Sequence, residues 1–253
     1  MASVARLTVF QIPAQQQALL VVCNLMKRYF ASLIVLLYIS IFHKLSGQQL
    51  HKDTAFLFKK ANHSIFIDNS PTAKFYDRIS DFRFGKFDKD NYDYSLQYLK
   101  DSGIKLTKYR IKDLPKKWII LKYFKDRFYL YYPCDFYHHF KVSITDNAFI
   151  DYGGEGPVVN KILSYKKISD NKFSFSLTGV ERPKRYLTIH IVDKANGIAI
   201  FEEWYDNNGR QYYLMIDAAK IRRQPIIVNY CKDQKQMEFD FVEPDFIKLL
   251  KTH

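Results

Sequence analysis

The chain has 253 residues, of which 39 are Lys or Arg and 26 are Asp or Glu, so its formal net charge is +13. The lysines are scattered among aspartates, which favours a solubilising role for this charge over a binding surface for polyanions. No His-x-His or Cys-x-x-Cys spacing occurs. The sequence therefore offers no zinc site, and we expect neither a metal nor a cofactor.

An apolar run is the first element that the pattern defines. Residues 29–42 carry no charged side chain; Lys27 and Arg28 precede them, and the small residues Ser46 and Gly47 follow. A basic start, an apolar core and a small-residue exit are the three parts of a secretory signal peptide. The core has 14 residues, whereas crossing a bilayer takes about 20. A cleavable signal is therefore favoured over the two alternatives, a membrane anchor and a buried helix.

This interpretation sets the compartment. Residues 1–47 would comprise an upstream segment and the signal peptide, with the natural start at Met26 and cleavage after Gly47. We expect an exported protein in the periplasm, the outer envelope or the extracellular space, with membrane contact only if the leader stays uncleaved. Residues 48–253 keep a net charge of +9, because the leader contains four basic residues and no acidic one. Export also argues against a nucleic-acid partner.

Residues 48–113 have a mixed pattern, which predicts a small α/β extension. Short apolar runs occur at 55–58 and 64–67. Residues 90–100 carry an imperfect apolar stripe, and Gly103 follows them, as is typical of a helix and its end.

From Trp118 onward the pattern changes to short strands separated by turn residues. Phe173, Phe175 and Leu177 alternate with polar residues, as a half-buried antiparallel strand requires. Asn196-Gly197 is typical of a two-residue hairpin turn. We expect strands at 118–124, 128–132, 140–145, 148–152, 161–168, 173–178, 186–191, 198–205, 211–217 and 226–231.

Successive hairpins with one apolar face must bury that face and protect their edges. A meander that closes into a barrel does both, and the connections are short throughout. We therefore predict a mainly β fold, an antiparallel up-and-down β-barrel over residues 114–253, with a short helix near 243–250. A two-sheet sandwich is the alternative.

The meander, with Lys116-Lys117-Trp118 at its first strand, resembles the lipocalin-like, or calycin, barrels of secreted bacterial proteins. The resemblance covers about residues 115–235. Lys116 stands where the family's Gly-x-Trp motif has glycine. By this resemblance, Trp118 would plug the base of the barrel. The leader and its exit at Gly47 are also similar to those of proteins exported by Bacteroidetes-type bacteria.

Two cysteines remain if the leader, and Cys23 with it, is removed. Cys134 and Cys231 lie 97 positions apart, and an even count in an oxidising compartment is typical of a disulfide. Two free, buried thiols are the alternative. Cys134 also lies near His138 and His139, so a thiol nucleophile with a neighbouring base is a further, weaker interpretation.

Two adjacent acidic residues, Glu202 and Glu203, lie in an expected strand. Side chains alternate along a strand, so one of the two faces the barrel interior, whichever face that is. A carboxylate there would need a partner such as Arg210 or Tyr212. If both residues lie at a strand end, both reach water instead.

Aromatic residues make up 17% of the chain and gather in the region 123–137. They can line a cleft for a lipid or a sugar, because aromatic rings combine apolar faces with polar tips, or they can simply fill the core. The loop at 153–156 is expected at the barrel mouth. The candidate ligand-binding residues are Trp118, Tyr129, Tyr131, Phe175, His190, Glu202, Trp204 and Tyr212.

Three functions remain open from the sequence. The leading hypothesis is binding of a small apolar or amphipathic ligand, lipid-like or aromatic, in the barrel. The second is a structural or interaction module of the cell envelope without a ligand. The third is a hydrolase or isomerase built on the barrel, with Glu202 or Cys134 at its centre. A binder needs free interior space, a structural module is filled by Phe and Tyr, and an enzyme brings titratable groups together.

Overall fold

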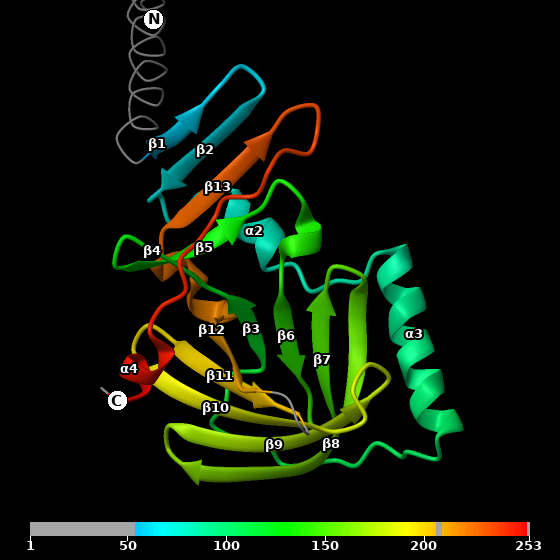
Figure 1. Ribbon diagram of the computed structural model, residues 1–253. Helices are drawn as coiled ribbons and strands as arrows, with labels where there is room; N and C mark the ends of the chain where they lie inside the picture. Colours follow the sequence, from blue (N-terminus) through cyan, green and yellow to red (C-terminus); the bar gives the residue numbers. More distant parts are fainter. Residues whose placement is uncertain (1–53, 206–208, 252–253) are drawn as a thin grey trace, which may run out of the picture. The chain divides into compact units, whose positions relative to one another are not determined.

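The computed structural model describes residues 54–205 and 209–251. The expected signal peptide and Cys23 lie outside this part. In the described chain, successive antiparallel strands close into an up-and-down barrel, because β12 returns to pair with β3 (Figure 1). The fold class is therefore confirmed. In order around the barrel, the strands are β3 (Lys117–Ile120), β6 (Lys141–Ile144), β7 (Ala148–Gly153), β8 (Gly156–Ser169), β9 (Lys172–Gly179), β10 (Arg185–Asp193), β11 (Ile198–Trp204) and β12 (Gln211–Asp217).

The barrel interior is filled by large apolar side chains. Phe173, Phe175 and Leu177 of β9 are at most 1% exposed, as their alternation with polar residues predicts. Trp118 is fully buried, contacts Phe201 edge to face, and donates its indole N–H to the carbonyl of Pro115 at 2.8 Å. The middle of the barrel is thus a packed core and leaves a ligand room only toward an end.

A second sheet lies beside the barrel, and it explains two corrections to the expected strands. It has the order β1-β2-β13-β5-β4, with β13 parallel to β5. Its strands are β1 (Thr54–Lys59), β2 (His63–Asp68), β4 (Lys122–Phe124), β5 (Arg127–Tyr132) and β13 (Ile226–Cys231). The expected strand at 118–124 is divided between the two sheets at Leu121, and the strands expected at 128–132 and 226–231 are not barrel strands.

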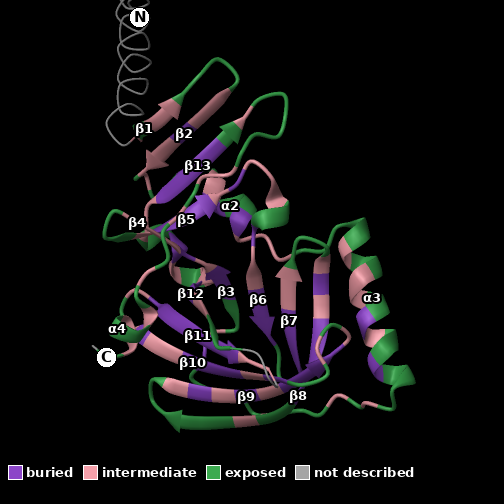
Figure 2. Cartoon of the chain, in the orientation of Figure 1, coloured by how far each residue is buried: buried purple, intermediate pink, exposed green. Residues whose placement is uncertain are grey.

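These strands were misassigned because both faces of the second sheet are buried. One face of the second sheet, with Leu130, Ile226 and Val228, packs in one core with barrel residues such as Ile200 and Leu214. Its other face packs against the segment that contains Phe239 and Phe241. Buried residues therefore run continuously along much of β5 and β13, as Figure 2 shows. A strand buried on both faces lacks the alternation by which a barrel strand is recognised.

Short helices cover the remaining surfaces. They are α2 (Phe75–Ile79), α3 (Lys86–Asp101) and α4 (Phe246–Lys251), with 3₁₀ turns η1 (Phe136–His138) and η2 (Ala218–Arg223). The helix α3 packs on the outer face of β7 and β8 through Leu99, Ile150 and Val159 (Figure 1). The helices expected at 90–100 and near 243–250 correspond to α3 and α4. No helix in the described residues combines the length and apolar character that a membrane crossing requires.

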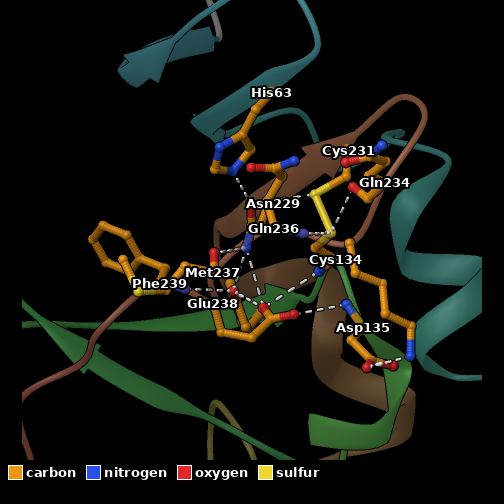
Figure 3. The surroundings of a disulfide bond; sticks show 12 residues. His63, Cys134, Asp135, Asn229, Cys231, Gln234, Gln236, Met237, Glu238 and Phe239 are labelled. Atoms are coloured by element: carbon orange, nitrogen blue, oxygen red, sulfur yellow. Dashed lines mark hydrogen bonds and ion pairs between the residues drawn. A yellow bond between two sulfur atoms is a disulfide. The ribbon is translucent and has the colours of Figure 1, made fainter.

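A disulfide between Cys134 and Cys231 joins the ends of β5 and β13 (Figure 3). Beside it, the Glu238 carboxylate accepts hydrogen bonds from the backbone N–H of Asp135 at 2.6 Å and from the side-chain amide of Asn229 at 3.1 Å. The Tyr131 hydroxyl also donates to Glu238. Burial, with this hydrogen bond to Glu238, raises the pKa of Tyr131, so the hydroxyl keeps its proton. The network fixes the chain after β13 across the sheet.

The disulfide makes a first prediction about stability. Replacing Cys134 and Cys231 together by Ser should lower the free energy of unfolding by about 4–5 kcal/mol, since a bridge across 97 residues restricts the unfolded chain. Urea unfolding of the variant and of the oxidised wild type measures the difference. A reductant should weaken only the wild type. Equal stability of variant and oxidised wild type would contradict the prediction.

His139 makes a second prediction, on pH dependence. Its ring is 7% exposed, and Nε2–H donates to the carbonyl of Ile79 at 3.0 Å. Burial, which outweighs this hydrogen bond, lowers the pKa of His139 from 6.5 to about 4. In the unfolded chain, His139 therefore takes up a proton near pH 6.5, whereas in the folded protein it takes up this proton only near pH 4. The contribution of His139 to the free energy of unfolding is fully present above pH 6.5 and is lost as the pH falls toward 4.

The loss should reach about 3 kcal/mol. Chemical unfolding at a series of pH values should show a shallower acid loss for His139→Gln, which cannot take up the proton. The exposed neighbour His138 supplies the matched control, and His138→Gln should follow the wild-type curve. Identical pH curves for His139→Gln and the wild type would contradict the assignment.

Candidate ligand site at the barrel mouth

Charged side chains converge inside one end of the barrel. This end, called the barrel mouth here, is formed by the turn at residues 153–156, where β7 leads into β8, and by residues 180–184 between β9 and β10. A pocket of about 270 Å³ opens there, and Arg182, Arg185, Glu203 and Asp151 line it. Trp118 lines a different pocket, with Lys194 and Gly197 of the β10–β11 turn at the other end. The two ends of the barrel therefore hold separate pockets.

Strand alternation explains how these charges come to point inward. Arg185 is in phase with Leu187 and Ile189 on β10, whose side chains belong to the barrel core. Glu203 is in phase with Phe201 on β11 in the same way. Asp151 is in phase with Phe149 on β7. Each of these three strands therefore carries an inward charge close to the mouth.

Arg185 is the centre of the ion-pair network at the mouth. Its Nη1 lies 2.8 Å from Oδ2 of Asp151 and 3.6 Å from Oε1 of Glu203. Arg182 reaches the same Glu203 oxygen at 2.5 Å, and the amide of Asn160 donates to Oδ2 of Asp151 at 2.9 Å. The residue Arg185 is only 5% exposed. Each carboxylate is thus held by a cation in a site with little water.

The other half of the Arg185 guanidinium is unused. Its Nε and Nη2 atoms are buried and have no hydrogen-bond partner among the described residues. Its central carbon lies 5.1 Å from the centre of the Phe149 ring, so the plane is supported from within the barrel. Most buried polar groups in folded proteins are hydrogen-bonded, so these two atoms are an exception that requires an explanation.

Burial also controls protonation at the mouth. Desolvation raises the pKa of Glu203, against the opposing effect of Arg185 and Arg182. Desolvation, with the charge of Glu203, raises the pKa of Tyr213 to about 12, so this hydroxyl remains a neutral donor. The ion-pair network at the mouth therefore combines two arginines with Asp151 and Glu203, beside a neutral phenol.

The glycine-rich turn approaches an aromatic side chain closely. A Cβ atom at Gly154 would collide with the ring of Tyr137, so only glycine allows this contact without displacement. Gly156 has φ of 106°, which non-glycine residues rarely adopt. Tyr137, Phe140 and Val158 complete the pocket with apolar surface, and the turn forms its rim as expected from the sequence.

The structure distributes the eight candidate ligand-binding residues over three places. Trp118 and Phe175 lie in the barrel core. Tyr129 and Tyr131 lie on the second sheet, outside the barrel, because β5 is not a barrel strand. Placing these two tyrosines in the barrel was therefore wrong.

The other four candidates, His190, Glu202, Trp204 and Tyr212, lie on the outer face of the barrel. Glu202 is paired with His190 at 2.9 Å and with Arg210 at 2.5 Å. Trp204 stacks on Tyr186, and Tyr212 stacks on Phe246 of α4. The two glutamates could not be told apart because β11 is buried on both faces. Cys134 is bonded to Cys231 and is no free nucleophile.

Sequence reasoning missed Asp151, Arg182 and Arg185. The available signal was the alternation of side chains along a strand. Arg185 lies on the same face of its strand as Leu187 and Ile189, and Asp151 lies on the same face as Phe149. A charge in phase with a buried face indicates a buried ion pair or a site.

No family model, curated protein or solved structure matches the chain in the comparisons with known proteins. The eight-stranded up-and-down architecture of residues 117–217 is consistent with a lipocalin-like fold. Within the described residues, no group of three or more His, Cys, Asp or Glu side chains is placed to hold a metal ion.

The Arg185–Asp151 pair makes a prediction about stability. Asp151→Asn should lower the free energy of unfolding by about 3 kcal/mol, because it leaves a buried guanidinium without its nearest counter-charge. Asp146→Asn is the matched control. It breaks an exposed pair with Lys116, so it should change stability by less than about 1 kcal/mol. Equal effects of the two substitutions in urea unfolding would contradict the assignment.

Proposed function

We propose that this protein binds a small amphipathic ligand at the barrel mouth. One observation carries the proposal: the charged side chains of Arg182, Arg185 and Glu203 converge in a pocket that also has aromatic walls. Ligand sites in proteins are typically apolar pockets in which a few placed polar groups fix the orientation of the ligand. The mouths of β-barrels are among their usual positions.

The size of the pocket limits the ligand. Its volume of about 270 Å³ lies just below the common range for small-molecule sites, roughly 300–1,000 Å³. Below it, Phe149, Phe175 and Phe201 fill the barrel. The ligand therefore has a body of about one ring or a short chain, packed against Tyr137, Phe140 or Tyr213 at the mouth. A long lipid chain has no room in the core.

The compartment and the relationship to calycins belong to the same proposal. We place the protein outside the cytoplasm, as an exported calycin of a Bacteroidetes-type bacterium in the periplasm, outer envelope or extracellular space. The Cys134–Cys231 disulfide supports this, because such bonds persist in oxidising compartments. The proposed partner is a small molecule rather than a nucleic acid, and membrane contact arises only through an uncleaved leader.

A second function, acid–base chemistry on the bound molecule, is favoured by the convergence of Asp151 and Glu203 in the pocket. Desolvation raises the pKa of Glu203 toward the range in which a carboxylate works as a general base. Turnover of a bound compound that stops in Glu203→Gln, with binding retained, would support this function.

Binding can be tested by nuclear magnetic resonance with a panel of small carboxylates, amides, alcohols and amines that share aromatic or short aliphatic bodies. At least one compound should shift the backbone signals of pocket residues such as Gly154 and Val158. In Val158→Phe, which fills the pocket, these shifts should disappear. Leu163→Phe is the matched control, because Leu163 lies on the same strand and is 42% exposed. No binding by any compound, or binding unchanged in Val158→Phe, would overturn the proposal.

A further inference from the structure

We propose that Lys122 is a nucleophilic amine and that it captures a small aldehyde with an apolar body as an imine. The site lies beside the barrel, and the proposal does not depend on the ligand site at the barrel mouth. Two observations carry it. The amino group of Lys122 has no partner among the described residues, and Lys122 lines a cavity large enough for a small molecule.

The cavity forms where the chain leaves the barrel. The pairing of β3 with β12 ends at Ile120 and Met215, and the next strand, β4, pairs with β5 in the second sheet. The segment that leads from β13 to α4 passes β4, where Val242 bridges Tyr123 (Figure 1). A cavity of about 360 Å³ remains between β4, β12 and this segment. This volume lies within the common range for small-molecule sites, roughly 300–1,000 Å³. The cavity, called the β4 groove here, is lined among others by Lys122, Tyr123, Tyr212, Leu214, Phe241 and Glu243.

The amino group of Lys122 is unpaired although the side chain is half-buried. Its Nζ makes no hydrogen bond or ion pair with a described residue, and it lies 5.8 Å from the centre of the Phe241 ring. Among the described residues, the fully buried side-chain nitrogens without a partner belong to Arg185 alone. The unpaired Nζ of Lys122 therefore retains accessible surface. Because Lys122 lines the β4 groove, a molecule in the groove can reach this atom.

A second half-buried lysine, Lys141, shows the contrast. Its Nζ donates a hydrogen bond to the backbone carbonyl of Asp81. Exposed lysines such as Lys116 are also bonded, in this case to the carboxylate of Asp146. Such a bond stabilises the protonated amine, which has no lone pair to offer. Lys122 has no such bond within the described part of the chain.

The surroundings of Lys122 also favour the neutral form of the amine. Burial lowers the pKa of Lys122, against the opposing charge of Glu243. Burial likewise lowers the pKa of the neighbouring His139, so this ring is uncharged at neutral pH. The other acid that lines the groove, Asp240, is exposed to water. A lysine that is desolvated in an apolar site is a typical protein nucleophile.

Imine formation uses only the neutral amine and the aldehyde. The lone pair of Nζ attacks the carbonyl carbon, a C–N bond forms, and one N–H proton moves to the carbonyl oxygen to give a carbinolamine. The hydroxyl group and the second N–H proton then leave as water, and the C–N bond becomes a C=N bond. The step therefore needs no oxidant, reductant or metal.

The walls of the groove limit the aldehyde. The rings of Tyr212, Phe241 and Phe246 offer apolar surface for its body. The carboxylates of Asp240 and Glu243 line the same groove and repel a negative charge. The preferred compound is therefore a neutral aldehyde with one ring or a short chain.

The test uses the oxidised full-length chain, benzaldehyde and sodium cyanoborohydride, which reduces an imine to a stable secondary amine. Peptide mass spectrometry gives the labelling rate of each lysine at pH 7. Lys122 should react about tenfold or more faster than the exposed Lys112 and Lys166, because the groove holds the aldehyde beside the amine. For the same reason, its rate should saturate as the benzaldehyde concentration rises. Lys141 should react no faster than the exposed lysines.

A charged probe, 4-formylbenzoate, tests the walls of the groove. Relative to the exposed lysines of the same chain, it should label Lys122 less than benzaldehyde does. This difference should decrease in Glu243→Gln, which removes one carboxylate from the groove. Asp93→Asn, at an exposed position of α3, is the matched control and should keep the difference. Equal relative labelling of Lys122 by the two probes would contradict the assigned ligand class.

A final comparison removes the nucleophile. Lys122→Arg keeps the positive charge, and saturable incorporation of benzaldehyde should disappear, whereas Lys166→Arg is the matched control and should retain it. The rates in the wild type decide the proposal even if Lys122→Arg does not fold. Labelling of Lys122 at the rate of the exposed lysines, or without saturation, overturns the proposal. Saturable incorporation that persists in a folded Lys122→Arg also overturns it, and in each case the site at the barrel mouth is unaffected.

Discussion

The pairing of β12 with β3 is the constraint on which the rest of the structure depends. It joins Met215 to Ile120, Ile216 to Ile119 and Asp217 to Trp118, and it turns an open meander into a barrel without free edges. Closure defines an inside, so that alternating residues on eight strands meet in one core. It also separates the two environments of β3. Ile119 faces the second sheet while Trp118 faces the barrel core, and the chain leaves the barrel directly afterwards at Leu121.

Strands with one buried face could be predicted from the sequence, whereas strands buried on both faces could not be assigned to a sheet. Phe173, Phe175 and Leu177 alternate with serines and threonine, so β9 and the meander around it could be predicted. The strands β5 and β13 are buried on both sides, and their apolar runs carry no information about which sheet they join. The parallel pairing of these two strands brings together residues about a hundred positions apart, which no local pattern encodes.

The candidate site was predictable only in part, for the same reason. The turn at 153–156 marks the barrel mouth by its glycines alone. The choice between Glu202 and Glu203 needs the inward face of β11, and that face is hidden because six of its seven residues are buried. Arg185 and Asp151 could have been found by phase with their apolar neighbours. Their pairing across the mouth depends on barrel closure, which places β7 near β10 and β11.

The composition of the second sheet has a consequence for the order of folding. The hairpin of β1 and β2 hydrogen-bonds to the rest of the sheet only through β13, which follows every barrel strand in the chain. The hairpin therefore stays without its neighbour until the whole barrel has been synthesised. Two-stranded hairpins are marginal in water, and non-local pairings form slowly. During synthesis, β2 must keep one edge unpaired until β13 has been made. The strand β13 ends at Cys231, whose disulfide with Cys134 then secures this part of the sheet.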